Sequence, residues 1–435
     1  MKKFGSITLC VYDRAGACGG PFGWATDFAG FFNSREFRVE VLILCPGGQV
    51  NSRIATACKL AEIPFAVLDT EISACLEDQT EWILVQWALR PSCVFVANLV
   101  LPAFYAGRWI RLAGGCTVGV IHSNPDHDLF YGDLLRYFVG GPRQWRLDAV
   151  VAVSDYIARK AKERAPAGMF VATIPCGTSV PAMRALPPTR ELRLLYCGRL
   201  TQEQKRIRDV TAALMDATEI LGVRATFCGD GEERPWLEAR LENQNRLQYV
   251  GNLPHPEVHR LMAQHHVIVL LSDYEGLPMA LAEGMACGLV PVCLDEPSGV
   301  REVIRDGVNG CLVKNRGPAF ISAIATLRNP EVWEPLSAEA RKTVERFYSH
   351  PVVFARWRAL IEELALAAQP RPQLLPRRIN LRSARPVESF IGYPCCRPAC
   401  REVVESRWRS AWMSFRKAAR LRARLRALLR SQPGD

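Results

Sequence analysis

Two glutamates, Glu275 and Glu283, lie in the segment YEGLPMALAEGMACGLVP, with seven residues between them. Carboxylates are natural acceptors for hydroxyl groups, so each glutamate could bind a pair of neighbouring sugar hydroxyls. Pro278 suits a first helical turn and Gly288 suits the position after a last one, which predicts a helix over about residues 278–287. Glu275 then lies on the loop before the helix, and Glu283 lies on the helix itself.

Backbone donors at the start of the same helix add to this candidate site. The N–H groups around Gly276 and Leu277 lie where unpaired donors and the helix dipole both favour an anion such as phosphate. The segment could therefore bind ribose, phosphate and sugar together. From spacing alone, an alternative stays open, in which Glu283 is a solvated helix residue and Glu275 a turn residue.

Two cations follow another apolar run, in the segment LLYCGRLTQEQKRIR that starts at Leu194. Arg199 comes directly after the expected strand, and Lys205 lies in the loop before the next helix. Together they could neutralise a departing nucleoside diphosphate without a metal ion. Taken alone, the same residues are an arginine and a lysine on a solvated loop, and Arg206 and Arg208 leave open which residue supplies the second cation.

The first half of the chain offers weaker signals. Glycines in the loop after the first strand, Gly19 and Gly20 among them, permit close approach of the backbone to a phosphate. The loop lacks the full dinucleotide glycine fingerprint, and no acidic residue ends the second strand at residues 44–46, so a nicotinamide cofactor is not expected. His122 ends the run CTVGVIH at a strand's carboxyl end, where ligands gather in open α/β sheets, although a structural hydrogen bond is the alternative.

The elements that must position these residues alternate between short apolar runs and helical patterns, which predicts parallel sheets covered by helices. The chain of 435 residues is longer than one hydrophobic core serves well, so two domains are expected. Residues 181–190 contain three prolines and no apolar periodicity, which indicates a linker. The expected strands are residues 7–12, 39–44, 65–68, 93–97, 117–121 and 149–153, then 192–197, 225–228, 247–250, 267–271, 290–294 and 310–313.

These patterns predict an α/β protein with two Rossmann-like, doubly wound domains. The first is expected over residues 1–180 and the second over residues 191–368. A helical stretch from about residue 337 to residue 368 is expected to close the second domain, and residues 369–435 form a basic tail.

The positive charge of the chain belongs to its tail. Of the net charge of +11, residues 371–435 contribute 16 Lys and Arg against 4 Asp and Glu, so the body is close to neutral and gives no reason to expect a nucleic-acid partner. Residues 407–430 place aromatic residues and leucines among arginines at mostly helical spacing, which suits a helix on an anionic membrane surface. A helix docked on protein and a solvated tail are the alternatives, with RNA binding as a third.

Most of the 16 cysteines sit singly in apolar runs, where a thiol behaves as a small hydrophobe, and this favours a reducing cytoplasm. The sequence contains no run of about 18 uncharged apolar residues, so no membrane-spanning helix is expected. Cys395, Cys396 and Cys400 fit no familiar zinc spacing, and no Asp-x-Asp element is suitably placed, so no metal site is expected.

The segment EGLPMALAEGMACGLVPV, followed by GVREVIRDGVNGCLV, resembles the donor-site signature of the family 4 retaining glycosyltransferases, which have the GT-B fold. The resemblance covers roughly residues 5–365. It implies that Glu283 holds the ribose of a nucleotide-sugar donor. It also implies that Glu275 contacts the donor sugar and phosphate together with the backbone of the next three residues, Gly276, Leu277 and Pro278.

Three further elements are similar to the same family. The Gly-Arg-Leu element with its lysine implies that Arg199 and Lys205 clamp the donor diphosphate. The glycine pair implies that Gly19 and Gly20 let the first domain close over the donor, and the histidine of VIHSN implies that His122 lies near the donor sugar. The implied catalytic set is His122, Arg199, Lys205 and Glu275, and the implied reaction is metal-independent hexosyl transfer with retention, by front-face displacement, with no cofactor beyond the donor itself.

The resemblance leaves the acceptor open, as a glycan or a lipid-linked molecule in cell-surface polysaccharide or glycolipid synthesis. A cytoplasmic enzyme, peripheral to the inner face of the membrane through its tail, is expected. One alternative is a UDP-sugar epimerase of the same fold, and the full EGLPMALAEGMACG segment argues against it. Another is a nucleotide-sugar-binding protein without turnover, which the joint presence of both glutamates and both cations disfavours.

Overall fold

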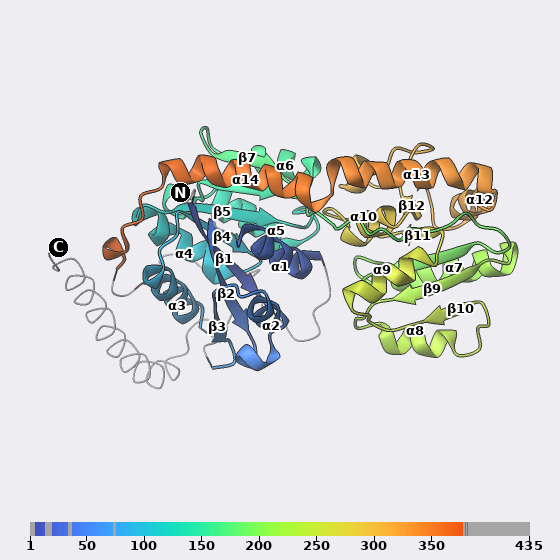
Figure 1. Cartoon of the computed structure of the whole chain (residues 1–435), viewed down its shortest axis with the longest axis horizontal. Coiled ribbons are helices and arrows are strands. Elements are labelled where there is room, and N and C mark those ends of the chain that lie inside the picture. Colours follow the sequence, from blue (N-terminus) through green and yellow to red (C-terminus); the bar gives the residue numbers. More distant parts are fainter. Residues whose placement is uncertain are drawn as a thin grey trace, which may run out of the picture.

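The computed structural model describes residues 5–13, 20–33, 37–72, 75–376, 379 and 381. Two parallel sheets, each covered by helices, lie side by side along the long axis of the molecule (Figure 1). One sheet is formed by the first half of the chain and the other by the second half. The expected α/β class with two doubly wound domains is therefore confirmed.

The first sheet has seven strands in the order β3-β2-β1-β4-β5-β6-β7. Its inner strands are buried on both faces, which is why they appear in the sequence as nearly continuous apolar runs. The strands are β1 (Gly5–Tyr12), β2 (Phe37–Cys45), β3 (Phe65–Asp69), β4 (Val94–Asn98), β5 (Cys116–Ile121), β6 (Ala149–Ala152) and β7 (Phe170–Thr173). The helices are α1 (Gly20–Phe32), α2 (Arg53–Leu60), α3 (Leu76–Leu89), α4 (Leu101–Leu112), α5 (Leu129–Leu134) and α6 (Asp155–Lys162), with the short turns η1 (Gly48–Asn51), η2 (Leu135–Val139) and η3 (Arg143–Trp145).

The second sheet has six strands in the order β10-β9-β8-β11-β12-β13. The direction of winding reverses between β8 and β11, and in such sheets the loops on either side of the reversal diverge and leave room for a ligand. The strands are β8 (Arg193–Cys197), β9 (Arg224–Cys228), β10 (Leu247–Tyr249), β11 (Val267–Leu270), β12 (Val290–Leu294) and β13 (Cys311–Val313). The helices are α7 (Ile207–Leu221), α8 (Arg234–Leu241), α9 (His255–Ala263), α10 (Met279–Ala286), α11 (Val300–Val303), α12 (Pro318–Thr326) and α13 (Pro330–Phe347).

Most predicted elements lie within two residues of their observed bounds. The helix expected over residues 278–287 is α10, with Pro278 and Cys287 as its caps. Strand β7 was not predicted from the sequence. Its residues at the edge of the sheet are half-buried or exposed, so they lack the continuous apolar run that marks the other strands.

The helical stretch that we expected to close the second domain is in fact divided between the domains. Helix α13 packs on the second domain, whereas α14 (His350–Ala367) lies along the first and contacts β1, β4 and β5 (Figure 1). Aromatic packing explains this placement, since the ring of Trp357 lies 5.1 Å from that of Phe28 and 5.6 Å from that of Trp24, both on α1. After η4 (Pro372–Leu374), the backbone N–H of Leu381 donates to Glu77 of α3 at 2.8 Å.

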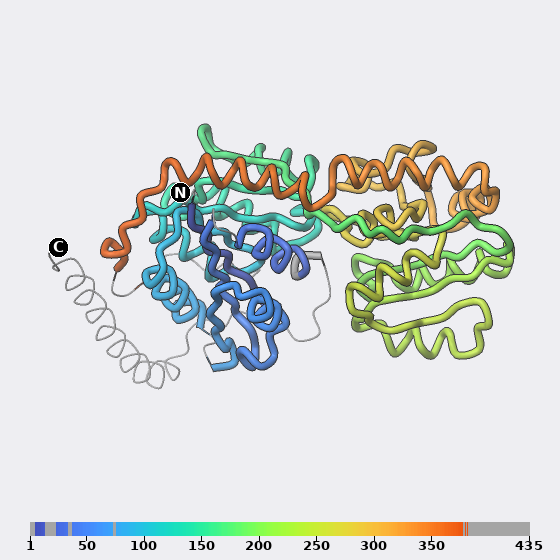
Figure 2. The backbone as a smooth tube through the Cα atoms, in the orientation of Figure 1, coloured from blue at the N-terminus to red at the C-terminus, as the bar shows by residue number. Residues whose placement is uncertain are grey.

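The chain therefore passes between the domains twice, once after β7 and once between α13 and α14. Figure 2 shows the two passages next to each other. They are hydrogen-bonded, because Thr178 N donates to Tyr348 O at 2.9 Å and His350 N donates to Thr178 O at 3.0 Å. Thr178 and Ser349 form a short parallel bridge there.

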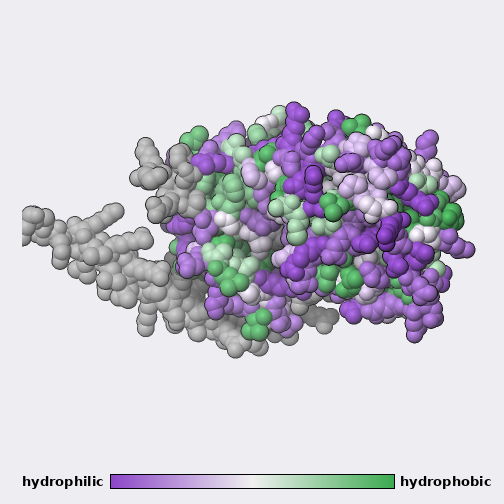
Figure 3. Space-filling view, turned by 45° about the vertical axis from the view of Figure 1, so that its right-hand side comes forward, coloured by the Kyte–Doolittle hydropathy of each residue, from purple (hydrophilic) through white to green (hydrophobic). Residues whose placement is uncertain are grey.

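The molecular surface that Figure 3 turns forward is mostly hydrophilic, with small and separate hydrophobic patches. Scattered patches of this kind are ordinary for a protein surface. Within the described ranges, no helix is long and apolar enough to cross a membrane.

Candidate functional site

Two loops meet at the carboxyl edge of the second sheet. Strands β8 and β11 are neighbours, so the loop that follows β8 lies beside the loop that follows β11. The backbone joins them directly, because Asp273 N donates to Gln204 O at 3.1 Å. Arg199 and Lys205 lie on the first loop and Glu275 on the second, at the point where the winding of the sheet reverses.

Lys205 and Glu275 form a close ion pair. Lys205 Nζ donates to Glu275 Oε1 at 2.5 Å, and the two side chains are only 12% and 7% exposed. A carboxylate this buried needs a charged or hydrogen-bonding partner, since isolated burial of a charge is costly. Lys205 is therefore the cation of this segment that contacts Glu275. Its neighbours point elsewhere: Arg206 contacts Asp209 and Asp273, and Arg208 contacts Glu233.

Gln204, which the sequence analysis did not single out, connects the parts of this site. Its amide oxygen accepts from Arg199 Nη2, and its Nε2 donates to Tyr274 O at 2.9 Å. The side chain is buried, and Nε2 also lies 3.5 Å from Glu275 Oε2. Tyr196 supports Arg199 from the strand side, because its hydroxyl donates to Arg199 O at 2.5 Å. Arg199 itself stays exposed, so its guanidinium is accessible to an anion.

Glu283 lies on α10, where its Oε1 is 3.2 Å from His255 Nε2. The Glu283 side chain is 16% exposed and that of His255 is 57% exposed. The hydrogen bond to Glu283 raises the pKa of His255 above its usual value, against the opposing effect of burial. His255 is a second residue that the sequence analysis missed, and no spacing rule connects the start of α9 with the middle of α10.

The start of α10 offers backbone donors. Its internal hydrogen bonds begin where Leu281 N and Ala282 N donate to Pro278 O. The first N–H groups of a helix have no partner within it, so those of Met279 and Ala280 can bind an anion. Pro278 is the N-cap residue of α10 and has no N–H, and the side chains of Leu277 and Pro278 are buried. Of the three backbone positions predicted to contact the donor, Pro278 therefore contributes shape and no hydrogen-bond donor.

Gly276 brings the second domain against the first. A Cβ atom at this position would lie 1.9 Å from His122 O, so only glycine fits. A Cβ atom at Gly299 would in turn lie 1.9 Å from Gly276 O. The backbone of His122, at the end of β5, thus lies directly against the loop that carries Glu275. The predicted proximity of these segments is present in the structure.

The ring of His122 is bonded within the first domain on both sides. Its Nε2 lies 2.6 Å from Asn98 Oδ1 and its Nδ1 lies 3.4 Å from Cys176 Sγ. The indole of Trp24 contacts it edge-on at 5.6 Å. Burial lowers the pKa of His122 to about 3, so the ring is neutral near pH 7. The structure therefore places His122 at the site but leaves neither ring nitrogen without a partner.

Two further contacts join the domains around this point. The ring of His127 stacks on that of Tyr274 at 4.8 Å. The carboxylate of Glu302 accepts from the backbone N–H groups of Asp155 and Tyr156, both at 2.6 Å, at the N-terminus of α6. A carboxylate there also complements the helix dipole. The domains are thus held together on both sides of the Gly276 contact.

Some of the predicted residues are not part of the site described above. Gly19 and most of the tail, including residues 407–430 and the three cysteines, lie outside the described residues. Gly20 is the first residue of α1. In the part of the chain that the structure describes, no group of three or more His, Cys, Asp or Glu side chains is arranged to hold a metal ion.

Comparison with known proteins agrees with this geometry. Residues 191–329 match the family model described as glycosyl transferases group 1. The putative glycosyltransferase EpsD of Bacillus subtilis is 28% identical over 218 residues, which is 46% of this chain and 57% of that protein. The lipopolysaccharide 1,6-galactosyltransferase of Salmonella typhimurium is 28% identical over 171 residues, which is 38% of this chain and 47% of that protein. The chain thus spans about half the length of such relatives.

The fold extends the likeness to both domains. The crystal structure of Alr3699/HepE from Anabaena, in complex with UDP and glucose, superposes with a TM-score of 0.65 and covers 82% of this chain and 100% of that chain, at 17% identity. At that identity the likeness concerns the fold alone. Residues 191–329 of the second domain are therefore similar in sequence to the group 1 glycosyl transferases, and the described chain as a whole has the two-domain GT-B fold.

Proposed function

We propose that this protein is a retaining glycosyltransferase that moves a sugar from a nucleotide-sugar donor to an acceptor without a metal ion. The observation that carries the proposal is the cluster of Arg199, Lys205 and Glu275 at the carboxyl edge of β8 and β11. It lies beside the N-terminus of α10 and against the His122 backbone of the other domain. This is the place in a doubly wound sheet where ligands bind.

The cluster is suited to the departure of a nucleoside diphosphate. Arg199 is held by Gln204 and Tyr196, and Lys205 is held by Glu275, so both cations are positioned before the donor arrives. Pre-positioned donors stabilise developing charge without reorganising at the moment of reaction. The first N–H groups of α10 add neutral donors for the same phosphates. Glu275 contacts Lys205 of the adjacent loop. We propose that it also accepts hydrogen bonds from hydroxyls of the donor sugar.

Glu283 is the proposed ribose ligand. One of its oxygens already contacts His255, which leaves the other to accept from a diol. His255 would hold the Glu283 side chain in one orientation, and a ligand held in one orientation loses less entropy on binding.

The reaction that this geometry supports is front-face displacement at the anomeric carbon. The acceptor enters on the face from which the diphosphate leaves, and no protein nucleophile is required. Catalysis then depends on positioning and on charge stabilisation. A neutral His122 bonded at both ring nitrogens is a poor acid or base near pH 7, which argues against epimerisation through this residue. We assign His122 to shaping the site beside the donor sugar.

The names of related proteins indicate the class of acceptor. Relatives include a lipopolysaccharide 1,6-galactosyltransferase and an amylovoran biosynthesis glycosyltransferase of Erwinia amylovora, and a structural neighbour binds UDP and glucose. We therefore propose a glycan or lipid-linked acceptor in polysaccharide or glycolipid assembly.

Donor binding is the first test. The full chain should be heated with UDP, GDP or ADP, and the matching diphosphate should raise its melting temperature. A ligand present at 100 times its Kd stabilises a protein by about 2.7 kcal/mol. Slow hydrolysis of the corresponding sugar donors should then be followed without an acceptor. If no diphosphate stabilises the protein and no donor is hydrolysed, the proposal is wrong.

The basic tail is the basis for a proposed location of the protein at a membrane. Residues 407–430 would lie on an anionic membrane surface, where each basic residue adds roughly 1 kcal/mol. Because Leu381 is anchored on α3, a matched truncation should end there and keep the packed segment intact. The full chain should sediment with anionic vesicles at low salt, while the truncated form stays in solution. Equal behaviour of the two forms would refute membrane binding through the tail.

A further inference from the structure

Arg206 has an unusual backbone conformation. Its φ of 53° and ψ of 43° are left-handed, and it is the N-cap of α7. Left-handed conformations are routine for glycine and uncommon for residues with long side chains. Adjacent side chains separate at this turn: Lys205 contacts Glu275 inside the site, and Arg206 points to the opposite side. An unfavourable conformation of this kind persists where the surrounding contacts determine it.

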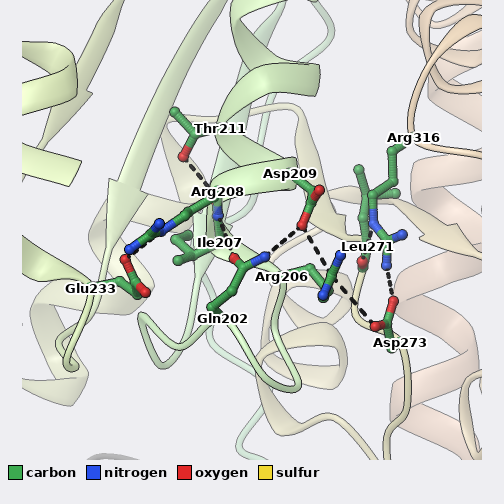
Figure 4. Close-up of polar contacts among 10 residues, drawn as sticks. All are labelled: Gln202, Arg206, Ile207, Arg208, Asp209, Thr211, Glu233, Leu271, Asp273 and Arg316. Atoms are coloured by element: carbon green, nitrogen blue, oxygen red, sulfur yellow. Dashed lines mark hydrogen bonds and ion pairs between the residues drawn. The ribbon is translucent and has the colours of Figure 1, made fainter. Parts of the chain in front are cut away.

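The contacts of Arg206 form a chain of ion pairs (Figure 4). Arg206 Nε lies 3.0 Å from Asp209 Oδ2 and 3.5 Å from Asp273 Oδ2. The other oxygen of Asp273 accepts from Arg316 Nη2, and Arg316 Nε donates to Leu271 O at 2.9 Å. Asp273 therefore joins the loop after β8, through Arg206, to its own loop after β11 and to Arg316 after β13.

The ion chain runs beside the backbone link between the same loops. Asp273 N donates to Gln204 O at 3.1 Å. Gln204 directly precedes Lys205 on the first loop, and Asp273 lies two residues before Glu275 on the second loop. Gln202 adds two hydrogen bonds next to Arg206. Its Nε2 donates to Asp209 Oδ2 at 2.8 Å, and its Oε1 accepts from Arg208 N at 3.0 Å (Figure 4). The side chains of Arg206 and Asp273 are 36% and 43% exposed, so neither is buried in the site.

We infer that Asp273 and Arg206 are positioning residues, which hold the Lys205 loop and the Glu275 loop in register from outside the site. Their role is indirect, because Arg206 and Asp273 contact each other and not Lys205 or Glu275. The inference rests on the proposed function for its effect on the reaction, but the bracing itself is a property of the free protein.

A small displacement explains why such a brace affects turnover. Isolated exposed ion pairs contribute little to stability, so loss of the brace leaves the fold intact. The reaction is more sensitive, since misplacement of a group by about 1 Å can lower a rate about 100-fold. We expect kcat to fall further than donor KM rises, because the leaving-group cation acts mainly in the transition state.

Three variants of the full chain isolate the brace. Asp273→Asn removes the central charge and keeps the backbone link to Gln204. Arg206→Gly removes the guanidinium and adopts the left-handed turn freely. The matched control is Arg208→Gln, which removes one positive charge, as Arg206→Gly does, from the first turn of α7 at an ion pair with Glu233 on the other side (Figure 4). Unfolding temperatures of all three should stay close to wild type.

Donor hydrolysis gives the kinetic outcome. Asp273→Asn and Arg206→Gly should each lower kcat/KM about 10-fold, chiefly through kcat. The double variant should be no more than about twofold worse than either single one, because both remove the same contact. Arg208→Gln should stay within about twofold of wild type. Full additivity of the two variants, or an equal effect of Arg208→Gln, would overturn the inference.

Amide hydrogen exchange of the free protein decides the bracing without any substrate. Exchange should rise in peptides covering residues 198–206 and 271–278 in Asp273→Asn and Arg206→Gly, and not in Arg208→Gln. Unchanged exchange in both loops overturns the inference, and so does faster exchange with kcat and KM within about twofold of wild type. If the wild type binds no diphosphate and hydrolyses no donor, the proposed function fails while the exchange result still decides the bracing.

Discussion

The two domains bring different chemistry to the point where they meet. The second domain supplies charge, with a buried Lys205–Glu275 pair, an exposed Arg199 and the Glu283–His255 pair. The first domain supplies a neutral histidine, bonded on both sides and lined by an indole ring. Under the proposed function, this difference would be a division of labour, in which one domain binds and stabilises the phosphates and the other closes the site and gives it shape.

This comparison also separates two uses of burial. Burial of Glu275 is compensated by an ion pair, because Lys205 Nζ lies 2.5 Å away. Burial of His122 without a charged partner has the opposite result, since it lowers the pKa to about 3 and removes the charge. The buried carboxylate of the second domain therefore has an ion-pair partner, whereas the ring of His122 is bonded to Asn98 and Cys176.

The largest predicted effect concerns the two cations. Arg199→Ala and Lys205→Ala should each lower kcat by about 100- to 1000-fold, because each removes a pre-positioned charge from the departing diphosphate. Single-turnover hydrolysis of the donor measures this, with Arg208→Gln as the control for charge loss in the adjacent first turn of α7. Near-normal turnover in both variants would break the proposed division of labour.

A smaller effect is expected at Glu283. Glu283→Ala should weaken nucleoside diphosphate binding by about 10-fold, since it removes a carboxylate acceptor of the ribose diol. Binding of inorganic pyrophosphate, which has no ribose, should be unchanged. Calorimetric titration of both ligands tests this. Equal loss of pyrophosphate affinity would show that Glu283 does not act through the ribose.

A third test concerns the stability contribution of His122 and its pH dependence. The folded protein does not protonate this ring between pH 6.5 and about 3, whereas the unfolded chain does, so the stability that His122 contributes falls as pH falls through that window. At pH 7.5, His122→Gln should lower the unfolding free energy by about 1–3 kcal/mol through the lost hydrogen bonds.

The difference between wild type and His122→Gln should therefore shrink from pH 7.5 to pH 5, as followed by denaturant melts. His127→Gln, which changes an exposed histidine on the same side of the domain, is the control. A stability difference that is constant over this pH range would contradict the account of a neutral, buried ring.

The smallest expected effect is that of metal removal. If cations of the protein neutralise the diphosphate, transfer should be unchanged in excess chelator. Turnover with and without EDTA measures this directly. Activity that disappears and returns with Mg²⁺ or Mn²⁺ would mean that Arg199 and Lys205 are insufficient, and that the charge is shared with a metal ion.

The sequence was most informative where burial leaves a continuous pattern. Inner strands such as β11 and β12 are apolar throughout because helices cover both their faces, and their bounds could be predicted closely. Helix α14 could not be assigned to its domain in the same way. Helical periodicity identifies an apolar face but not the surface that it covers, and here the covering surface is α1 of the first domain.

The site shows the same limit. Arg199, Lys205 and Glu275 were predictable because each follows a strand at the edge where the winding reverses. Gln204 and His255 were not, because each acquires its role from a partner far along the chain: Gln204 from a residue 70 positions away and His255 from one 28 positions away. A glutamine next to a lysine, or a histidine at a helix start, gives no sign of such a partner.

The double passage of the chain between the domains has a mechanical consequence. Because the two passages are hydrogen-bonded to each other at Thr178 and Ser349, they act as a single pivot. Two passages joined in this way restrict the relative motion of the domains more than a single passage would. Each opening and closing would return Gly276 to the same point on His122, so the alignment of the site is set by the pivot as well as by its own side chains.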